Sequence, residues 1–442
     1  MELKNNKIIS TAFITLLFFI MAYSPPFYNA EADELLDILK AKGLLTEGEA
    51  ANLEKGGDQK LKGKFKDGFK WESGDKASSI QIGGRVHGDV DIFETSHAKP
   101  STIYLRRARL EAGGRFYEYY EFKVQGDYGE GAFSAKDLFI NMNYDERLQL
   151  KVGQYKEPLA LEQITSTKYI DFKERSLIGG RIAPDRDIGI MLHGHFAEKT
   201  LGYQLGVFNG NGSNVKEDTD GDKDIAMRVW YEPFKDLHLG GAFTWGHLSR
   251  GLTDYKQSGS SSNVLAFDSA KVNGANMDLL RTGAELSYGI GPARITSEYM
   301  RADYGNVNVV STGTPNDFFV QGVYANASWF LTGEEKRPKG GEFGKLHPNQ
   351  NFNLKTGGLG AWELLAGYEW VDVDRDWLNV AGLSGADRTD SYKAGINWYH
   401  NPLFRVMLDY VYNDYSADIV KQDVGAKKDY EHQVWMRFSL EF

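Results

Sequence analysis

The sequence predicts an all-β protein, a 16-stranded antiparallel transmembrane β-barrel with a short N-terminal helical segment. Three observations support this fold class. Apolar and polar residues alternate with a period of two from Ile80 onward. The chain is rich in glycine (49 of 442 residues) and in aromatic residues (13%), yet a quarter of it is charged. No run of 18 apolar residues occurs after the N-terminal region. A barrel with one face in lipid and a wet lumen explains all three, because its two faces average to a polar composition.

The alternation is clearest from Ile80 to Ile92, where even-numbered residues are apolar or glycine and odd-numbered residues are polar except Gly83. Successive residues of a strand point to opposite faces, so such a segment has a lipid face and a lumen face. Counting these segments predicts sixteen strands, an even number as expected for a closed barrel with both chain ends on one side. The predicted strands are 80–92, 103–115, 120–128, 135–144, 148–155, 187–196, 201–208, 225–232, 237–246, 280–288, 293–301, 318–330, 361–371, 391–400, 404–412 and 431–442. A secreted array of β-sandwiches is the alternative, but it would normally contain more than 11 prolines.

The links between these strands alternate in length. Tight links such as 289–292 and 400–403 alternate with long polar links such as 156–186 and 247–279. Short periplasmic turns and longer external loops are typical of outer-membrane barrels. The link 331–359 breaks this rule, because it is long where a short turn is expected, and the sequence offers no reason for its length.

The N-terminal region is expected to be separate from the barrel. Residues 1–32 are predicted to be a secretory signal peptide, with a basic start, an apolar run and the sequence Ala30-Glu31-Ala32 at the cleavage site. A single membrane anchor is the alternative. Residues 33–70 are expected to form periplasmic amphipathic helices and a Gly/Lys-rich linker, and 71–442 the transmembrane barrel.

The sequence contains none of the catalytic motifs that would indicate an enzyme. The chain has no cysteine, which excludes thiol nucleophiles and zinc–thiolate sites, and it has no P-loop, G-x-S-x-G or H-E-x-x-H motif. The acidic segment 218–224 resembles a calcium loop but lacks the required Gly and Glu, so a solvated turn is expected, with a weak surface calcium site as the alternative. We therefore expect no enzyme activity, no cofactor and no metal site. The net charge of −10 argues against a nucleic-acid partner.

The alternation also predicts which charges face the lumen. Arginine suits a phosphate path, because its planar fork binds phosphate oxygens bidentately and stays charged. Arg106 falls on the lipid-side parity, near the external rim, where its long side chain can reach water. The cations expected on the lumen face are Arg85, Arg107, Arg109, Arg115, Lys123 and Lys151, and the long link 156–186 adds Lys156, Lys168, Lys173, Arg175, Arg181 and Arg186. The carboxylates expected there are Asp89, Asp91, Glu111, Asp127, Asp137, Glu285, Glu298, Glu363, Glu369 and Asp409, so any anion selectivity must be local.

Several motifs in order along the chain resemble the phosphate-selective porin O and P family. They are Gly83-Gly84-Arg85, Tyr104-Leu105-Arg106-Arg107-Ala108-Arg109-Leu110-Glu111, Gly153-Gln154-Tyr155-Lys156-Glu157-Pro158, Thr165-Ser166-Thr167-Lys168, Glu174-Arg175-Ser176, Leu331-Thr332-Gly333-Glu334, Gly360-Ala361-Trp362-Glu363-Leu364 and Asn397-Trp398-Tyr399-His400-Asn401-Pro402. The resemblance implies a trimeric porin whose third external loop folds inward to narrow the pore. It also implies that Arg85, Arg106 and Arg107 match the family's pore arginines and that Lys168 and Arg175 lie on its third-loop motif. Glu121 departs from the family, standing where a lysine is expected.

Together these observations predict a porin of the Gram-negative outer membrane, with its N-terminal segment in the periplasm, for passive diffusion of anions and of phosphate foremost. The expected partners are small anions, outer-membrane lipids and two further copies of the chain. The residues expected to bind the anion are Arg85, Arg106, Arg107, Arg109, Lys123, Lys168 and Arg175. A general small-solute porin without phosphate selectivity is one alternative, and an outer-membrane enzyme or adhesin built on the long loops is the other.

Overall fold

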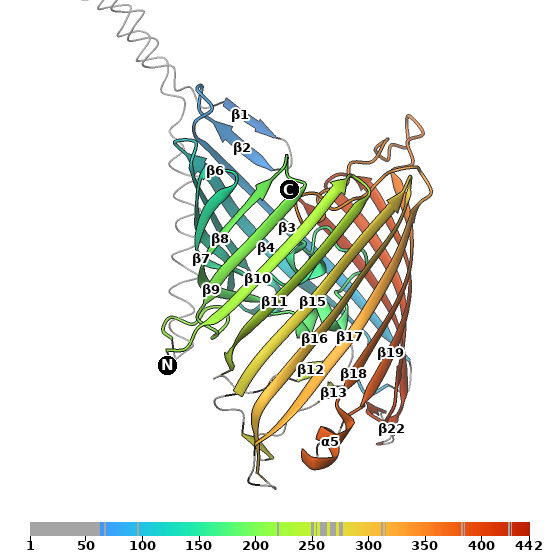
Figure 1. The fold of residues 1–442 in the computed structure, drawn as a ribbon. Coiled ribbons are helices and arrows are strands. Elements are labelled where there is room, and N and C mark those ends of the chain that lie inside the picture. The colour runs from blue at the N-terminus through green and yellow to red at the C-terminus, as the bar shows by residue number, and fades with distance from the viewer. Residues whose placement is uncertain are drawn as a thin grey trace, which may run out of the picture.

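The computed structural model is a closed antiparallel barrel of sixteen strands, in which each strand pairs with the next and β23 pairs with β3 to close the sheet (Figure 1). It describes residues 62–442, apart from 66–67, 95–96, 219–220, 249–251, 253, 257–262, 266–270, 274–276, 311–312, 314, 382, 384, 423–424 and 426. The predicted signal peptide, the helices and most of the linker lie outside the described residues, as does part of the calcium-like segment 218–224.

The barrel strands confirm the sixteen predicted segments, although several run further than the alternation suggested. They are β3 (Ser79–Phe93), β4 (Thr102–Phe116), β5 (Tyr120–Asp127), β6 (Ser134–Asp145), β7 (Leu148–Lys156), β8 (Arg186–Phe196), β9 (Leu201–Phe208), β10 (Asp224–Phe234), β11 (Leu237–Leu248), β15 (Met277–Ile290), β16 (Ala293–Val309), β17 (Pro315–Phe330), β18 (Ala361–Val373), β19 (Arg388–Asn401), β20 (Phe404–Tyr415) and β23 (Tyr430–Glu441).

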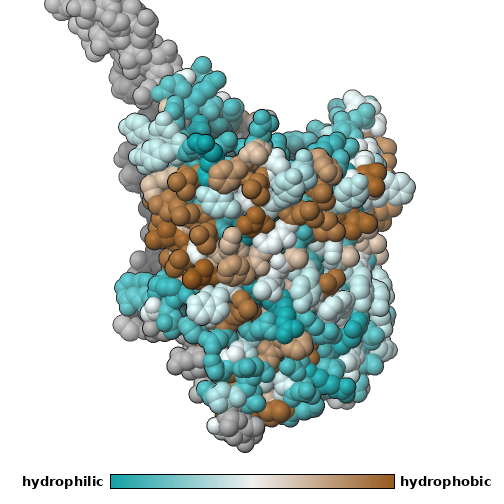
Figure 2. Space-filling model, in the orientation of Figure 1, coloured by the Kyte–Doolittle hydropathy of each residue, from teal (hydrophilic) through white to brown (hydrophobic). Residues whose placement is uncertain are grey.

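The alternation sorts the side chains as expected for a membrane barrel. On β4 the outward Ile103 is 81% exposed, whereas the inward Asp91 on the neighbouring strand β3 is buried. Apolar side chains form a belt over the half of the barrel nearest the C-terminus, and the surface toward the long loops is more hydrophilic (Figure 1 and Figure 2). Apolar side chains are favoured on the outer face, because that face contacts lipid. The period of two is therefore sufficient to set which side chains of each strand face outward.

Part of the predicted linker is a strand pair. The strands β1 (Lys62–Phe65) and β2 (Phe69–Glu72) form a hairpin, and β2 pairs with β3 through Phe69–Ile82 and Trp71–Ile80. The hairpin extends the barrel wall at the end where the chain terminates (Figure 1). The Gly/Lys-rich composition concealed this, because glycine and lysine both have low strand propensity.

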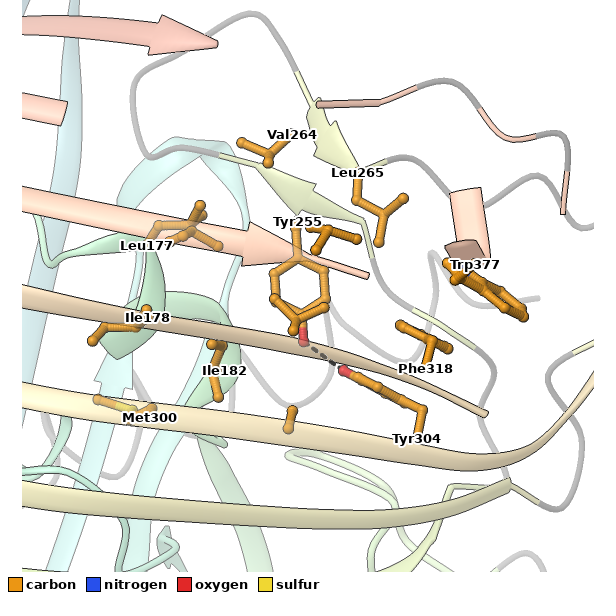
Figure 3. Packing of buried hydrophobic residues seen from close by; sticks show 14 of the residues in the cluster. Leu177, Ile178, Ile182, Tyr255, Val264, Leu265, Met300, Tyr304, Phe318 and Trp377 are labelled. Atoms are coloured by element: carbon orange, nitrogen blue, oxygen red, sulfur yellow. Dashed lines mark hydrogen bonds between the residues drawn. The ribbon is translucent and has the colours of Figure 1, made fainter. Parts of the chain in front are cut away.

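The long loop between β7 and β8, residues 157–185, lies inside the barrel. It contains α4 (Leu161–Ile164) and the helical turn η2 (Ile178–Ile182). Its residues Leu177, Ile178 and Ile182 pack with Tyr255 and Tyr304, whose hydroxyl groups are hydrogen-bonded at 2.5 Å (Figure 3). This cluster fills one side of the lumen toward the loop end. The loop therefore narrows the barrel, as the resemblance implied.

The unusually long turn between β17 and β18, residues 331–360, also enters the lumen. The Lys336 ammonium donates to Asp171 of the inner loop at 2.8 Å, and the Phe343 backbone N–H donates to Thr165 Oγ1 at 3.2 Å. Leu346 packs in a small core with Phe330 and Tyr399. The length of this turn is explained by its position, because it enters the lumen and contacts the inner loop.

The remaining described elements are short and lie in the loops. They are η1 (Gly129–Gly131), β12 (Tyr255–Lys256), β13 (Asn263–Leu265), β14 (Val272–Asn273), α5 (Arg375–Ala381), β21 (Val420–Lys421) and β22 (Lys427–Lys428). None of the helices in the described part of the chain has the length and apolar character to cross a bilayer.

Candidate functional site

A cavity of about 780 Å³ lies between the inner loop 157–185 and the wall formed by β3–β10. Its lining is strongly basic, with twelve cationic side chains against six carboxylates. The cations are Arg85, Arg106, Arg107, Arg109, Lys123, Lys136, Lys151, Lys156, Arg175, Arg181, Arg186 and Arg228, and the acids are Asp127, Glu130, Asp137, Glu174, Asp185 and Glu342. The local excess of positive charge contrasts with the negative total of the chain.

The cavity brings together six of the seven predicted anion-binding residues: Arg85, Arg106, Arg107, Arg109, Lys123 and Arg175. Lys168 is not among the lining residues. It donates to Glu111 at 2.9 Å and lines a small recess with Tyr169 and Arg405. Burial lowers the pKa of the Lys168 ammonium, and the neighbouring positive charge of Arg85 acts in the same direction.

The predicted lipid-side orientation of Arg106 is wrong. A β-bulge interrupts the pairing of β3 with β4, so that His87 pairs with Arg107 while the next residue, Gly88, pairs with Leu105. Arg106 is the extra residue on β4, and its guanidinium reaches Glu174 of the inner loop at 3.2 Å. A bulge places two consecutive side chains on one face, and strict alternation could not detect it.

Several lining cations are neutralised by carboxylates. Arg107 donates through both terminal nitrogens to Glu174 at 3.3 Å, and Arg437 donates to the same carboxylate at 2.6 Å. Arg109 donates to Asp127 at 2.6 Å. Burial alone would raise the pKa of Glu174, but the surrounding arginines hold it well below its usual range. These pairs orient the arginines and reduce the charge they present to the cavity.

A second group of cations donates hydrogen bonds only to uncharged hydroxyl and carbonyl oxygens. Arg85 donates to the Thr167 hydroxyl at 2.7 Å. Arg175 and Lys156 both donate to backbone carbonyls of residues 162–165, at distances from 2.6 to 3.2 Å. Within the described part of the chain none of these three forms an ion pair. Burial lowers the pKa of Arg175, but a guanidinium remains charged at physiological pH.

Two lysines extend this group along the wall. Lys151 lies over the rings of Phe139 and Tyr155, at 4.8 and 5.4 Å from their centroids. The Lys136 side chain has no hydrogen bond or ion pair with any described residue. The alternation on β7 predicted that Lys151 faces the lumen. Lys136 was missed because the register of β5 with β6 shifts between Val124 and Gly126.

Buried carboxylates of the wall hold the inner loop in place. Glu298 accepts the backbone N–H groups of Leu161 and Glu162, both at 2.7 Å, and Asp409 accepts that of Lys173 at 2.7 Å. Asn397 donates to the Asp171 carbonyl at 2.9 Å. Three of the predicted inward carboxylates, Glu298, Asp409 and Glu369, therefore anchor the backbone of the inner loop.

Asp171 of the inner loop joins the loop to both the wall and the turn 331–360. Its carboxylate accepts from Arg294 on β16 at 2.6 Å and from Lys336 at 2.8 Å. Burial alone would raise the pKa of Asp171, but the two cations hold it below its usual range. No group of three metal-binding side chains occurs among the described residues.

A closed sixteen-stranded barrel narrowed by an inner loop is the architecture of porins in the outer membrane of Gram-negative bacteria. The model of the family described as phosphate-selective porin O and P matches residues 80–442. The chain therefore belongs to this family and lies in the outer membrane.

Individual relatives agree with this family. The chain is 24% identical to Porin O of Pseudomonas aeruginosa over 390 residues, covering 79% of this chain and 86% of the relative. Among solved structures it is similar to OmpT of Vibrio cholerae in a trimer form (TM-score 0.52, 14% identity, 83% of this chain and 100% of that chain). It is also similar to an anion-selective porin from Comamonas acidovorans (TM-score 0.51, 12% identity, 83% and 100%). At these identities the two structures support the fold.

Proposed function

We propose that this porin conducts small anions by passive diffusion, phosphate foremost, through the cavity between the inner loop and the wall. The observation that carries the proposal is the set of lining cations without a carboxylate partner among the described residues: Arg85, Lys136, Lys151, Lys156, Arg175 and Arg181. A fixed positive charge at a constriction attracts anions, and a guanidinium can hold phosphate oxygens bidentately. The family name and the anion-selective relative from Comamonas acidovorans support the same assignment.

The predicted anion-binding residues take different parts in this proposal. Arg85 and Arg175 bind the anion directly. Arg106, Arg107, Arg109 and Lys123 shape the path while partly neutralised. Lys168 contributes indirectly, by holding the carboxylate of Glu111.

Reversal potentials of purified protein in planar bilayers with a KCl gradient test the proposal. We expect the potential to lie near the chloride equilibrium value, and phosphate to block the chloride current at low concentration. A potential near the potassium value would refute the anion assignment.

The neutralised cations favour a second candidate, a general porin for small solutes. Six of the twelve lining cations are paired with carboxylates: Arg106, Arg107, Arg109, Lys123, Arg186 and Arg228. Liposome swelling distinguishes the candidates. A general porin passes neutral monosaccharides rapidly, whereas a narrow anion filter does not.

We also propose that the protein assembles as a homotrimer and acts as a channel, without enzyme activity. The trimer form of the related OmpT structure supports the first statement, and the porin family the second. Mass measurement of the detergent-solubilised protein tests the trimer.

A further inference from the structure

The turn 331–360 carries one carboxylate, Glu342, into the basic cavity. The residues on either side of it are attached to opposite structures. Gly341 donates its N–H to Glu232 of β10 at 3.1 Å, and its carbonyl accepts from Arg228 at 2.7 Å. On the other side, Phe343 donates its N–H to Thr165 of the inner loop. Glu342 therefore sits on a short bridge across the lumen, between the wall and the loop.

The Glu342 side chain differs from every other acid of the cavity. Glu130, Asp127, Asp137, Glu174 and Asp185 each form an ion pair with an arginine. Glu342 is exposed to the cavity and forms no hydrogen bond or ion pair through its side chain with any described residue. Its negative charge acts on Lys151 and Arg228 from across the space. It is therefore a free negative charge at the periplasmic side of a basic path.

We propose that Glu342 is a residue that determines valence selectivity, limiting how tightly the basic path holds an anion. The inference rests on the proposed anion conduction. A pore must bind its ion strongly enough to admit it and weakly enough to release it. A negative charge on the exit side reduces the depth of the binding well, and does so in proportion to the charge of the ion. Divalent phosphate is therefore affected more than chloride.

The size of the effect follows from elementary electrostatics. A unit charge about 8 Å away in water changes the occupancy of a monovalent anion about twofold and that of a divalent anion about sixfold. Removing the charge of Glu342 is accordingly expected to strengthen divalent phosphate binding about sixfold and chloride binding about twofold.

The substitution Glu342→Gln keeps the shape of the side chain and removes the charge. The matched control is Glu335→Gln in the same turn, where the carboxylate pairs with Lys235 at 2.9 Å on the exterior. Both variants are compared with the wild-type protein in planar bilayers. The measured quantities are the reversal potential in a KCl gradient and the phosphate concentration that halves the chloride current. Heat-modifiable migration on a gel verifies that each barrel is folded.

We expect E342Q to move the reversal potential toward the chloride value and to lower the blocking phosphate concentration about sixfold at a pH where phosphate is divalent. E335Q should match the wild type. Unchanged values in E342Q, or an equal change in E335Q, would overturn the role of Glu342. The two proposals fail separately: a cation-selective wild type refutes anion conduction, yet the shift caused by E342Q in that background still measures the effect of Glu342.

Discussion

Arg85 and Arg109 face the same cavity but differ in their partners. Arg85 donates to a hydroxyl group, whereas Arg109 is paired with Asp127. A guanidinium without a carboxylate partner is free to use its charge on a passing anion. A paired one must first give up an existing ion pair, so the two positions should differ in their effect on phosphate.

We therefore expect Arg85→Gln to weaken phosphate block of the chloride current about tenfold, the loss of about one charge-assisted hydrogen bond. Arg109→Gln should have a smaller effect. The measurement is the phosphate concentration that halves the single-channel current. Equal effects of the two substitutions would show that the carboxylate partner does not matter.

Glu162 in the inner loop is a buried carboxyl with a raised pKa. Burial raises the pKa of its carboxyl to about 7, while its hydrogen bond from Ser176 acts in the opposite direction. A carboxyl whose pKa is raised in the folded state favours folding when protonated. Its contribution is full below the unfolded value of 4.5 and is lost as the pH rises through about 7.

The stability difference between the wild type and Glu162→Gln should accordingly change between pH 5 and pH 8. The wild type loses stability relative to the variant as the pH rises. Thermal unfolding of both proteins across this range is the measurement. Glu217→Gln, at a side chain that is 80% exposed, is the control and should show no such change.

At the scale of elements, Asp171 is the link between the inner loop, the wall and the turn 331–360. Its removal leaves Arg294 and Lys336 buried without their main carboxylate. Breaking one partner of a buried ion pair typically costs about 3–5 kcal/mol. The cost arises because an uncompensated charge remains out of water.

Asp171→Asn should therefore lower the stability of the barrel by about 3–5 kcal/mol and loosen the inner loop. Denaturant unfolding in detergent measures the first effect, and the noise of the open-channel current the second. A variant as stable as the wild type would contradict the anchoring role.

At the scale of the whole molecule, two segments occupy the lumen from opposite ends. The inner loop 157–185 enters from the side of the long loops, and the turn 331–360 from the side of the C-terminus. They meet at Asp171 and Thr165. Strand pairing does not depend on the turn, because β17 and β18 pair directly from Val320–Val373 to Phe330–Glu363.

Replacing residues 334–358 by a short Asn-Gly link should leave a folded barrel with a wider lumen. We expect higher conductance and faster swelling of liposomes in neutral sugars. A folded variant with unchanged conductance would show that the turn does not restrict the path.

The sequence alone determined the class of fold, the strands and most of the lumen face. These follow from a local rule, since successive side chains of a strand alternate between lipid and water. The rule failed where the backbone departs from regular pairing, at Arg106 and Lys136. The family motifs and the position of the inner loop were also predictable from the sequence.

Only the tertiary structure decided which cations are paired with carboxylates. Arg107 pairs with a carboxylate 67 positions away in the chain, and Lys336 with one 165 positions away. Among the described residues, Arg85 pairs with no carboxylate and the Glu342 side chain with no cation. Such pairs depend on how the barrel closes and on where a loop and a turn fold within it. The alternation of a single strand contains no information about either, so the sequence could list the charges of the pore but not their balance.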